Sequence, residues 1–220
     1  MPPCNHEEAD TRIVIHVLHA LQSGCKSVVI RTVDTDVVVI LVGKFGRLII
    51  ERPDADIWIA FGMGKHFTFI SVNRVFAFLG ETRASCLPVF HALSGCDTTS
   101  AFVGKGKRSA WQAWQQYNAV TPTLAYLAEN PSQHLDADSE HFQKIERMAV
   151  IMYDKSCPCD SINEARKELF CKQNRAMDKL PPTKVTKICK LFSNAGTAFC
   201  VIFFVSTQLL EILNGIFKLF

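Results

Sequence analysis

Two apolar stretches joined by an acidic tip constrain the fold more than any other feature of this sequence. Residues 27–31 and 37–42 are rich in Val and Ile, have the length of strands, and are separated by Val33-Asp34-Thr35-Asp36. Nearly continuous apolar runs are typical of strands that are covered on both faces in a parallel sheet. Before them, apolar residues recur every three or four positions over residues 7–22, which predicts a helix. Helix and strands in this order predict an α/β fold with a mostly parallel sheet.

The rest of the chain divides into a short β-type stretch and a longer helical one. Runs of β type over 47–51, 56–61 and 65–73 predict an antiparallel β-hairpin insertion, and residues 75–79 fit either a strand or a helix. Helices are predicted over 87–93, around Trp111 and Trp114, and over 124–128, 139–153 and 163–177. We therefore expect an α/β domain over 4–115, a helical region over 116–190 and an apolar tail over 191–220.

Composition excludes some classes of protein and leaves others open. Of the 220 residues 48% are hydrophobic, which excludes an intrinsically disordered chain. The 24 Lys and Arg residues exceed the 21 Asp and Glu residues by only 3, so binding to nucleic acid has to depend on local patches. Nine cysteines without regular spacing indicate a reducing, intracellular compartment. Cys157-Pro158-Cys159 is a close pair, but it lacks a second pair at zinc-finger spacing, and we assign no metal to it.

The apolar tail has two interpretations. Residues 191–210 contain no charged side chain and are about as long as a membrane-spanning helix, and Lys184, Lys187 and Lys190 precede them. Several polar residues interrupt the stretch, and Glu211 follows it. The sequence therefore predicts either a membrane anchor or a helix that is buried or covered by a partner.

Acidic residues stand where an α/β sheet places its ligands. Asp34 and Asp36 follow a predicted strand, and ligands bind at the carboxyl ends of parallel strands. Glu7, Glu8 and Asp10 open the first helix, and Asp97 follows a glycine that ends a later one. Each of these acids has a second interpretation as a helix cap or as a partner of the helix dipole.

Four short motifs follow one another between residues 6 and 110. They are His6-Glu7-Glu8-Ala9-Asp10, Val33-Asp34-Thr35-Asp36, Ser94-Gly95-Cys96-Asp97 and Gly104-Lys105-Gly106-Lys107-Arg108-Ser109-Ala110. This order resembles the internal region of the flap-endonuclease/XPG family of PIN-like nucleases, over about residues 4 to 115. It also looks like uncharacterised invertebrate proteins that share these motifs.

The resemblance implies a site and its chemistry. In this family, carboxylates hold two Mg²⁺ ions that act on a phosphodiester, and the metals lie about 4 Å apart. The implied catalytic and metal-binding residues are Glu8, Asp10, Asp34, Asp36 and Asp97, with Glu7 as a weaker alternative. The implied nucleic-acid-binding residues are Gly104, Lys105, Gly106, Lys107 and Arg108. DNA rather than RNA is the expected partner, and a nuclear location is implied.

The chain also departs from the family pattern. Family members carry an amino-terminal region with further carboxylates and a basic residue, whereas this sequence begins directly at the internal region. Two functions follow from the residues that are present. The first is a metal-dependent, structure-specific nuclease, for which we expect little or no activity in this chain. The alternative is a non-catalytic module that binds nucleic acid or a protein, anchored to a membrane if the tail spans one.

Overall fold

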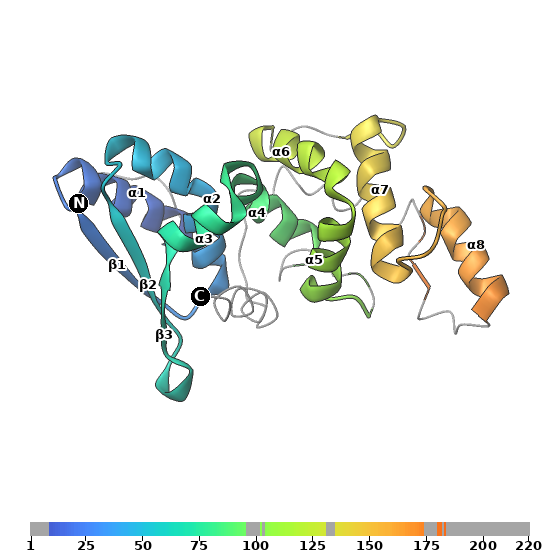
Figure 1. Cartoon of the computed structure of the whole chain (residues 1–220), viewed down its shortest axis with the longest axis horizontal. Coiled ribbons are helices and arrows are strands. Elements are labelled where there is room, and N and C mark those ends of the chain that lie inside the picture. The colour runs from blue at the N-terminus through green and yellow to red at the C-terminus, as the bar shows by residue number, and fades with distance from the viewer. Residues whose placement is uncertain are drawn as a thin grey trace. The chain divides into compact units, whose positions relative to one another are not determined.

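The computed structural model describes residues 9–95, 102, 104–130, 135–173, 180–181 and 183 (Figure 1). These residues form two compact units, one up to Pro88 and one from Val89 onward. The division falls inside helix α4 (Glu81–Leu93). It lies well before residues 115/116, where the sequence predicts the end of the α/β domain, so that predicted domain contributes to both units.

A three-stranded sheet of mixed direction forms the first unit together with its helices. Strand β1 (Ser27–Thr32) pairs in parallel with β2 (Asp56–Phe61), in register from Ser27 opposite Asp56 to Thr32 opposite Phe61. Strand β3 (Thr68–Ser71) pairs with β2 in the antiparallel direction and follows the short helix η1 (Gly64–His66). Helix α2 (Thr35–Glu51) connects the two parallel strands. The predicted α/β class is therefore confirmed, and so are the strand over 27–31 and the strand over 56–61.

Helix α2 corrects two of the predicted strands. Residues 37–42 and 47–51, both expected to be strands, lie in this one helix of 17 residues. All residues from Val37 to Val42 are buried, so an unbroken apolar run here belongs to a helix with protein on nearly every side. Periodicity alone does not separate such a helix from a buried strand. The antiparallel hairpin is consequently shorter than predicted and contains β2 and β3 alone.

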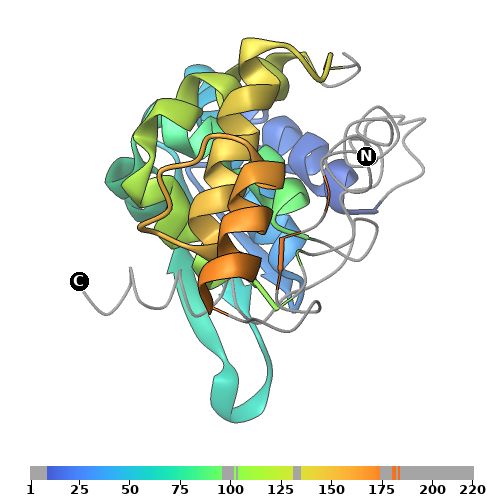
Figure 2. The same ribbon diagram turned by 90° about the vertical axis from the view of Figure 1, so that its right-hand side faces the viewer.

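The core of the first unit lies between the sheet and its helices. Ile30, Ile59 and Ile70 are neighbours across the three strands, and all three are buried. Helix α1 (Ala9–Gln22) packs on α2, and α3 (Val72–Leu79) packs on α2 and β2. The tip of the β2–β3 hairpin extends away from these helices (Figures 1 and 2). Residues 75–79, which fit either a strand or a helix in the sequence, are thus helical. The helix predicted over 7–22 is confirmed over its described residues.

The second unit is helical, as the sequence predicts for this part of the chain. After α4 come α5 (Lys107–Gln116), the short helix η2 (Asn118–Val120), α6 (Thr121–Glu129), α7 (Glu140–Tyr153) and α8 (Ile162–Gln173). Helix α7 packs against α5, α6 and α8. The rings of Phe90 and Trp114 stack with centroids 4.9 Å apart, and Trp111 meets both rings edge-on. Both tryptophans are buried, so this aromatic cluster belongs to the core of the second unit.

No helix in the described part of the chain is both long and apolar enough to cross a membrane. The tail over 191–220 lies outside the described residues. Both interpretations of that tail therefore stay as predictions.

A close contact between α2 and α4 generates a prediction about stability. A Cβ atom on Gly43 would lie 2.7 Å from Cγ and 2.8 Å from Cδ of Pro88, a rigid ring. Gly43→Ala should lower the free energy of unfolding by about 1–3 kcal/mol, because the two helices must separate. The control is Gly46→Ala on the same helix, where the nearest atom lies 3.6 Å away and removal of a helical glycine should stabilise by about 0.5–1 kcal/mol. Chemical denaturation measures both, and equal effects of the two changes would contradict the contact.

Candidate functional site

The first candidate site is the turn from β1 into α2, in the first unit. Asp34 is the N-cap of α2, and its Oδ1 accepts a hydrogen bond of 2.9 Å from the backbone N–H of Asp36. The backbone N–H of Asp34 donates in turn to Oγ1 of Thr32, at 3.0 Å. Asp36 lies in the first turn of the helix with its side chain 0% exposed. Two carboxylates therefore stand at the carboxyl end of a parallel strand, as predicted, and the helix dipole favours negative charge there.

The other predicted carboxylates fall outside what the structure describes. Glu8 and Asp97 lie outside the described residues, as does Glu7. Asp10 lies within α1, but its side chain is not among the described ones. Convergence of these residues with Asp34 and Asp36 therefore stays a prediction.

The basic loop before α5 is a separate candidate site, and it lies in the second unit. The N–H of Lys105 donates to the carbonyl of Phe102 at 2.9 Å, which closes a tight turn through the exposed Gly104. The Nζ of Lys105 lies 5.4 Å from the centre of the Tyr153 ring, a cation–π distance. Gly106 is the N-cap of α5, and Arg108 is exposed in the first turn. Lys105 and Arg108 are thus the two cations of this loop that reach solvent.

Lys107, predicted to contact nucleic acid, has a different role in the structure. Its side chain is 2% exposed, and its Nζ donates to the carbonyl of Gly95 at 2.6 Å and to the carbonyl of His91 at 3.1 Å. A third contact, of 3.3 Å, joins Nζ to Oγ of Ser94. The ammonium therefore caps the carboxyl end of α4, where the last carbonyls lack helical partners and the dipole favours a cation. A phosphate could reach Lys107 only if these bonds were broken.

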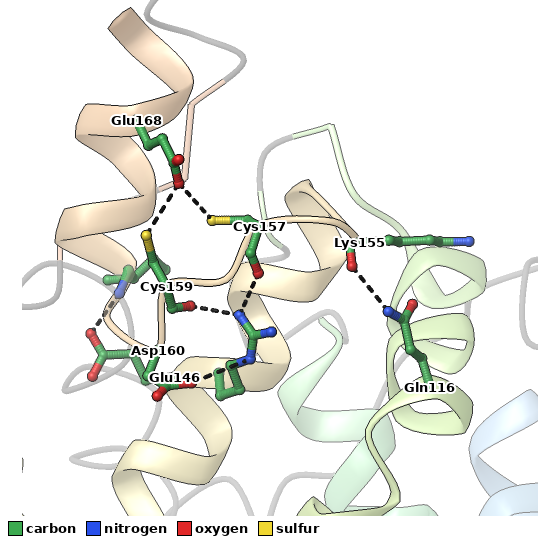
Figure 3. A network of polar contacts seen from close by, with 9 residues as sticks. Gln116, Glu146, Lys155, Cys157, Cys159, Asp160 and Glu168 are labelled. Atoms are coloured by element: carbon green, nitrogen blue, oxygen red, sulfur yellow. Dashed lines mark hydrogen bonds and ion pairs between the residues drawn. The ribbon is translucent and has the colours of Figure 1, made fainter. Parts of the chain in front are cut away.

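A cluster of two thiols and a carboxylate lies between α7 and α8. The Sγ atoms of Cys157 and Cys159 lie 3.4 Å and 3.2 Å from Oε2 of Glu168, and Figure 3 shows both sulfurs pointing to that carboxylate. The hydrogen bond to Glu168 raises the pKa of the Cys159 thiol to about 12. Cys157 is buried, and the other two residues are partly exposed. Among the described residues, these three offer ligand atoms that all lie within 4.8 Å of one another.

Two side chains of α7 hold the loop that carries the thiols. Arg147 donates from Nη1 to the carbonyls of Cys157 and Cys159, at 2.8 Å and 2.6 Å, and its Nε lies 3.4 Å from Oδ1 of Asp160. Glu146, which is buried, accepts hydrogen bonds from the N–H of Ile162 at 2.8 Å and from a neighbouring serine hydroxyl. Arg147 thus fixes the loop backbone, and Glu146 accepts the hydrogen bond of a backbone N–H at the start of α8.

Sequence reasoning saw the close cysteine pair but missed its third member. Glu168 is nine positions beyond Cys159 and enters the cluster because the chain turns back along α8. The available signal was a carboxylate on the helix that follows Cys157-Pro158-Cys159. Only the packing of α8 on α7 shows that this acid faces the thiols.

The outer face of the sheet in the first unit is apolar and exposed. Val29 and Phe69 are each 58% exposed, on strands β1 and β3. Phe67 packs edge-on against Phe69, with ring centroids 5.1 Å apart, and Arg31 lies over the Phe67 ring at 5.2 Å. Trp58 on β2 is partly exposed, and its Nε1 donates to Asp56. Grouped apolar side chains of this kind mark interaction surfaces more often than single ones do.

Comparison with models of known protein families, with curated proteins and with solved structures found no match to this chain. Function is therefore inferred from the residues and their geometry.

The burial of Lys107 leads to a prediction that separates its structural role from phosphate binding. Lys107→Met keeps most of the side-chain volume but removes the ammonium, so the carbonyls of Gly95 and His91 lose a charged donor. The free energy of unfolding should fall by about 1.5–3 kcal/mol. Arg108→Met, an exposed change at the next position, should alter it by less than about 0.5 kcal/mol. A denaturation curve of Lys107→Met that coincides with wild type would show that the cap contributes nothing.

Proposed function

We propose that this chain is a PIN-like, metal-dependent, structure-specific nuclease-like protein for nucleic-acid phosphodiesters, with little or no cleavage activity of its own. The position of Asp34 and Asp36 is the observation that carries the proposal. Both follow β1, the strand that pairs in parallel with β2, and α2 begins between them. In α/β sheets this carboxyl end is where ligands bind, and the short spacing places two acids at one helix start.

The donor set suits a hard divalent cation. Mg²⁺ prefers oxygen ligands, and Asp34 and Asp36 offer carboxylate oxygens. When bound in such sites, Mg²⁺ positions water and stabilises charge on the scissile phosphodiester. By the family resemblance, Asp97 and either Glu8 or Asp10 complete the set of ligands. DNA is the proposed substrate, and a nuclear location goes with it.

The basic loop supports contact with a nucleic-acid backbone. Arg108 is exposed, and Lys105 carries its charge over Tyr153 without an ion pair in the described residues. Gly106 is the N-cap of α5, and the N–H groups in the first turn of a helix are donors that a phosphate oxygen accepts from. Lys107 is left out of this proposed surface because it caps α4.

A non-catalytic binding module is the second candidate, and specific observations favour it. Asp34 already serves as a helix cap, which explains an acid at this position without any metal. The exposed Val29 and Phe69 on the outer sheet face suit a protein partner. This candidate shares the basic loop with the first and differs from it in having no dependence on a divalent metal.

The first test isolates the carboxylate of Asp34 from its capping role. Asp34→Ser keeps an N-cap oxygen for the N–H of Asp36 but removes the charge, so the fold should be retained. Binding of flap, bubble and hairpin DNA should tighten when Mg²⁺ or Mn²⁺ is added to wild type, and this gain should disappear in Asp34→Ser. Fluorescence anisotropy measures it, with product formation followed on gels in the same samples.

The control is Asp54→Ser, which removes an exposed carboxylate from the same unit, where it pairs with Lys26 and Arg52. This variant should behave as wild type does. An equal metal response in wild type and Asp34→Ser would rule out the proposed metal site at Asp34. DNA binding that does not change with metal in any of the three proteins would leave the binding module.

The second test concerns the phosphate contacts of the basic loop. Lys105→Ala and Arg108→Ala should each weaken DNA binding and reduce the slope of log affinity against log salt by about 0.9 per lost contact. Lys107→Met, measured where it is folded, should leave the slope unchanged because its ammonium faces α4. If the slope drops for Lys107→Met but not for Arg108→Ala, the assignment of the loop is wrong.

A further inference from the structure

The two thiols and the carboxylate between α7 and α8 have the geometry of a metal site. We propose that Cys157, Cys159 and Glu168 bind one Zn²⁺ ion, with the fourth position taken by water. With Zn–S bonds of about 2.3 Å and a Zn–O bond of about 2.0 Å, a tetrahedral site separates sulfur from oxygen by about 3.5 Å. The observed separations of 3.4 Å and 3.2 Å match that edge. Small adjustments of the side chains are therefore enough to seat the ion.

The ligand types select zinc over the magnesium proposed for the aspartates. Thiolates are soft ligands that suit zinc, whereas hard cations prefer all-oxygen sites. On binding, each thiol releases its proton to solvent as its sulfur bonds to the ion, and Glu168 bonds as a carboxylate. The zinc site therefore belongs to the second unit and is independent of the proposed nuclease chemistry.

Arg147 supports the site from the other side of the loop. It donates to the carbonyls of both cysteines, so the loop backbone is held at its carbonyls while the sulfurs point to Glu168. Ligands oriented by an outer layer of hydrogen bonds bind metals more tightly. Two thiolates and a carboxylate carry three negative charges, of which Zn²⁺ neutralises two, and the Arg147 guanidinium, which also pairs with Asp160, lies close to the loop that carries the thiols.

The bound ion would stabilise the helical unit. Residues 154–161 join α7 to α8 without regular secondary structure, and both cysteines lie there. Glu168 lies on α8, so the ion would link the loop to the helix that follows it. Because the folded cluster binds the ion better than the unfolded chain does, zinc should raise the unfolding temperature.

The experiment is a zinc titration of the full chain, stripped of metal and kept reduced with a phosphine, in competition with a chromophoric chelator. Wild type should bind one more equivalent of zinc than a variant with Cys157→Ser and Cys159→Ser. The matched control replaces Cys25 and Cys171, two exposed free thiols, by serine and should keep that equivalent. The remaining cysteines are common to all three proteins, so they add the same background.

A second pair of variants tests the carboxylate without disturbing the thiols. Glu168→Gln keeps the shape of the side chain and should weaken zinc binding by more than roughly tenfold, the lower end of the loss seen when an outer-layer partner is removed. Glu164→Gln, an exposed change one turn earlier on α8, should bind zinc as wild type does. Unfolding curves in chelator show that both variants are folded before zinc is added.

Cobalt gives a spectroscopic readout that packing alone does not affect. Co²⁺ in wild type should show thiolate charge-transfer bands in the near ultraviolet, and these should be lost together with one metal equivalent in the Cys157/Cys159 variant. Equal zinc stoichiometry in the Cys157/Cys159 and Cys25/Cys171 variants would overturn the proposal. So would an unchanged zinc affinity in Glu168→Gln.

Discussion

The buried start of helix α2 is the constraint on which the first unit depends. The first N–H groups of a helix have no helical acceptor, and Thr35 and Asp36 are fully buried, so water does not supply one. The carboxylate of Asp34 supplies an acceptor, and the helix then continues through an apolar run that α1 and α3 cover. Asp34 thus has a structural role as the N-cap of α2, whether or not it also binds a metal. The same side chain carries the proposed chemistry, so loss of fold and loss of function there have to be measured separately.

Much of the fold is readable from the sequence where the pattern is unambiguous. The predicted helix over 139–153 is found, with Ser139 accepting a hydrogen bond from the N–H of Phe142 as its N-cap. The strands over 27–31 and 56–61 are also found, because each is short, rich in β-branched or aromatic residues and bounded by turn residues. The strand predicted over residues 37–42 is wrong, because burial on all sides removes the polar positions that mark the period of a helix.

The candidate site was predictable where chemistry follows local position, and not where it depends on contacts between distant residues. The placement of Asp34 and Asp36 after a strand follows from the local pattern alone. The burial of Lys107 does not follow from the local pattern, because a Gly-Lys-Gly-Lys-Arg run by itself indicates a solvated loop. The burial depends on the end of α4, which lies next to this lysine in the fold. The sequence assigns no metal to Cys157 and Cys159 because no second cysteine pair stands at zinc-finger spacing, and the proximity of Glu168 depends on how α8 folds back.

The placement of the three tryptophans makes the two units distinguishable by intrinsic tryptophan fluorescence. Trp58 lies partly exposed on the sheet of the first unit, whereas Trp111 and Trp114 are buried beside Phe90 in the second. Emission from the buried pair shifts to longer wavelengths when the helical unit opens, and Trp58, already in contact with solvent, changes less. In a chain with phenylalanine at position 58, the tryptophan fluorescence would come from the helical unit alone. Unfolding of that unit could then be followed without a signal from the first unit.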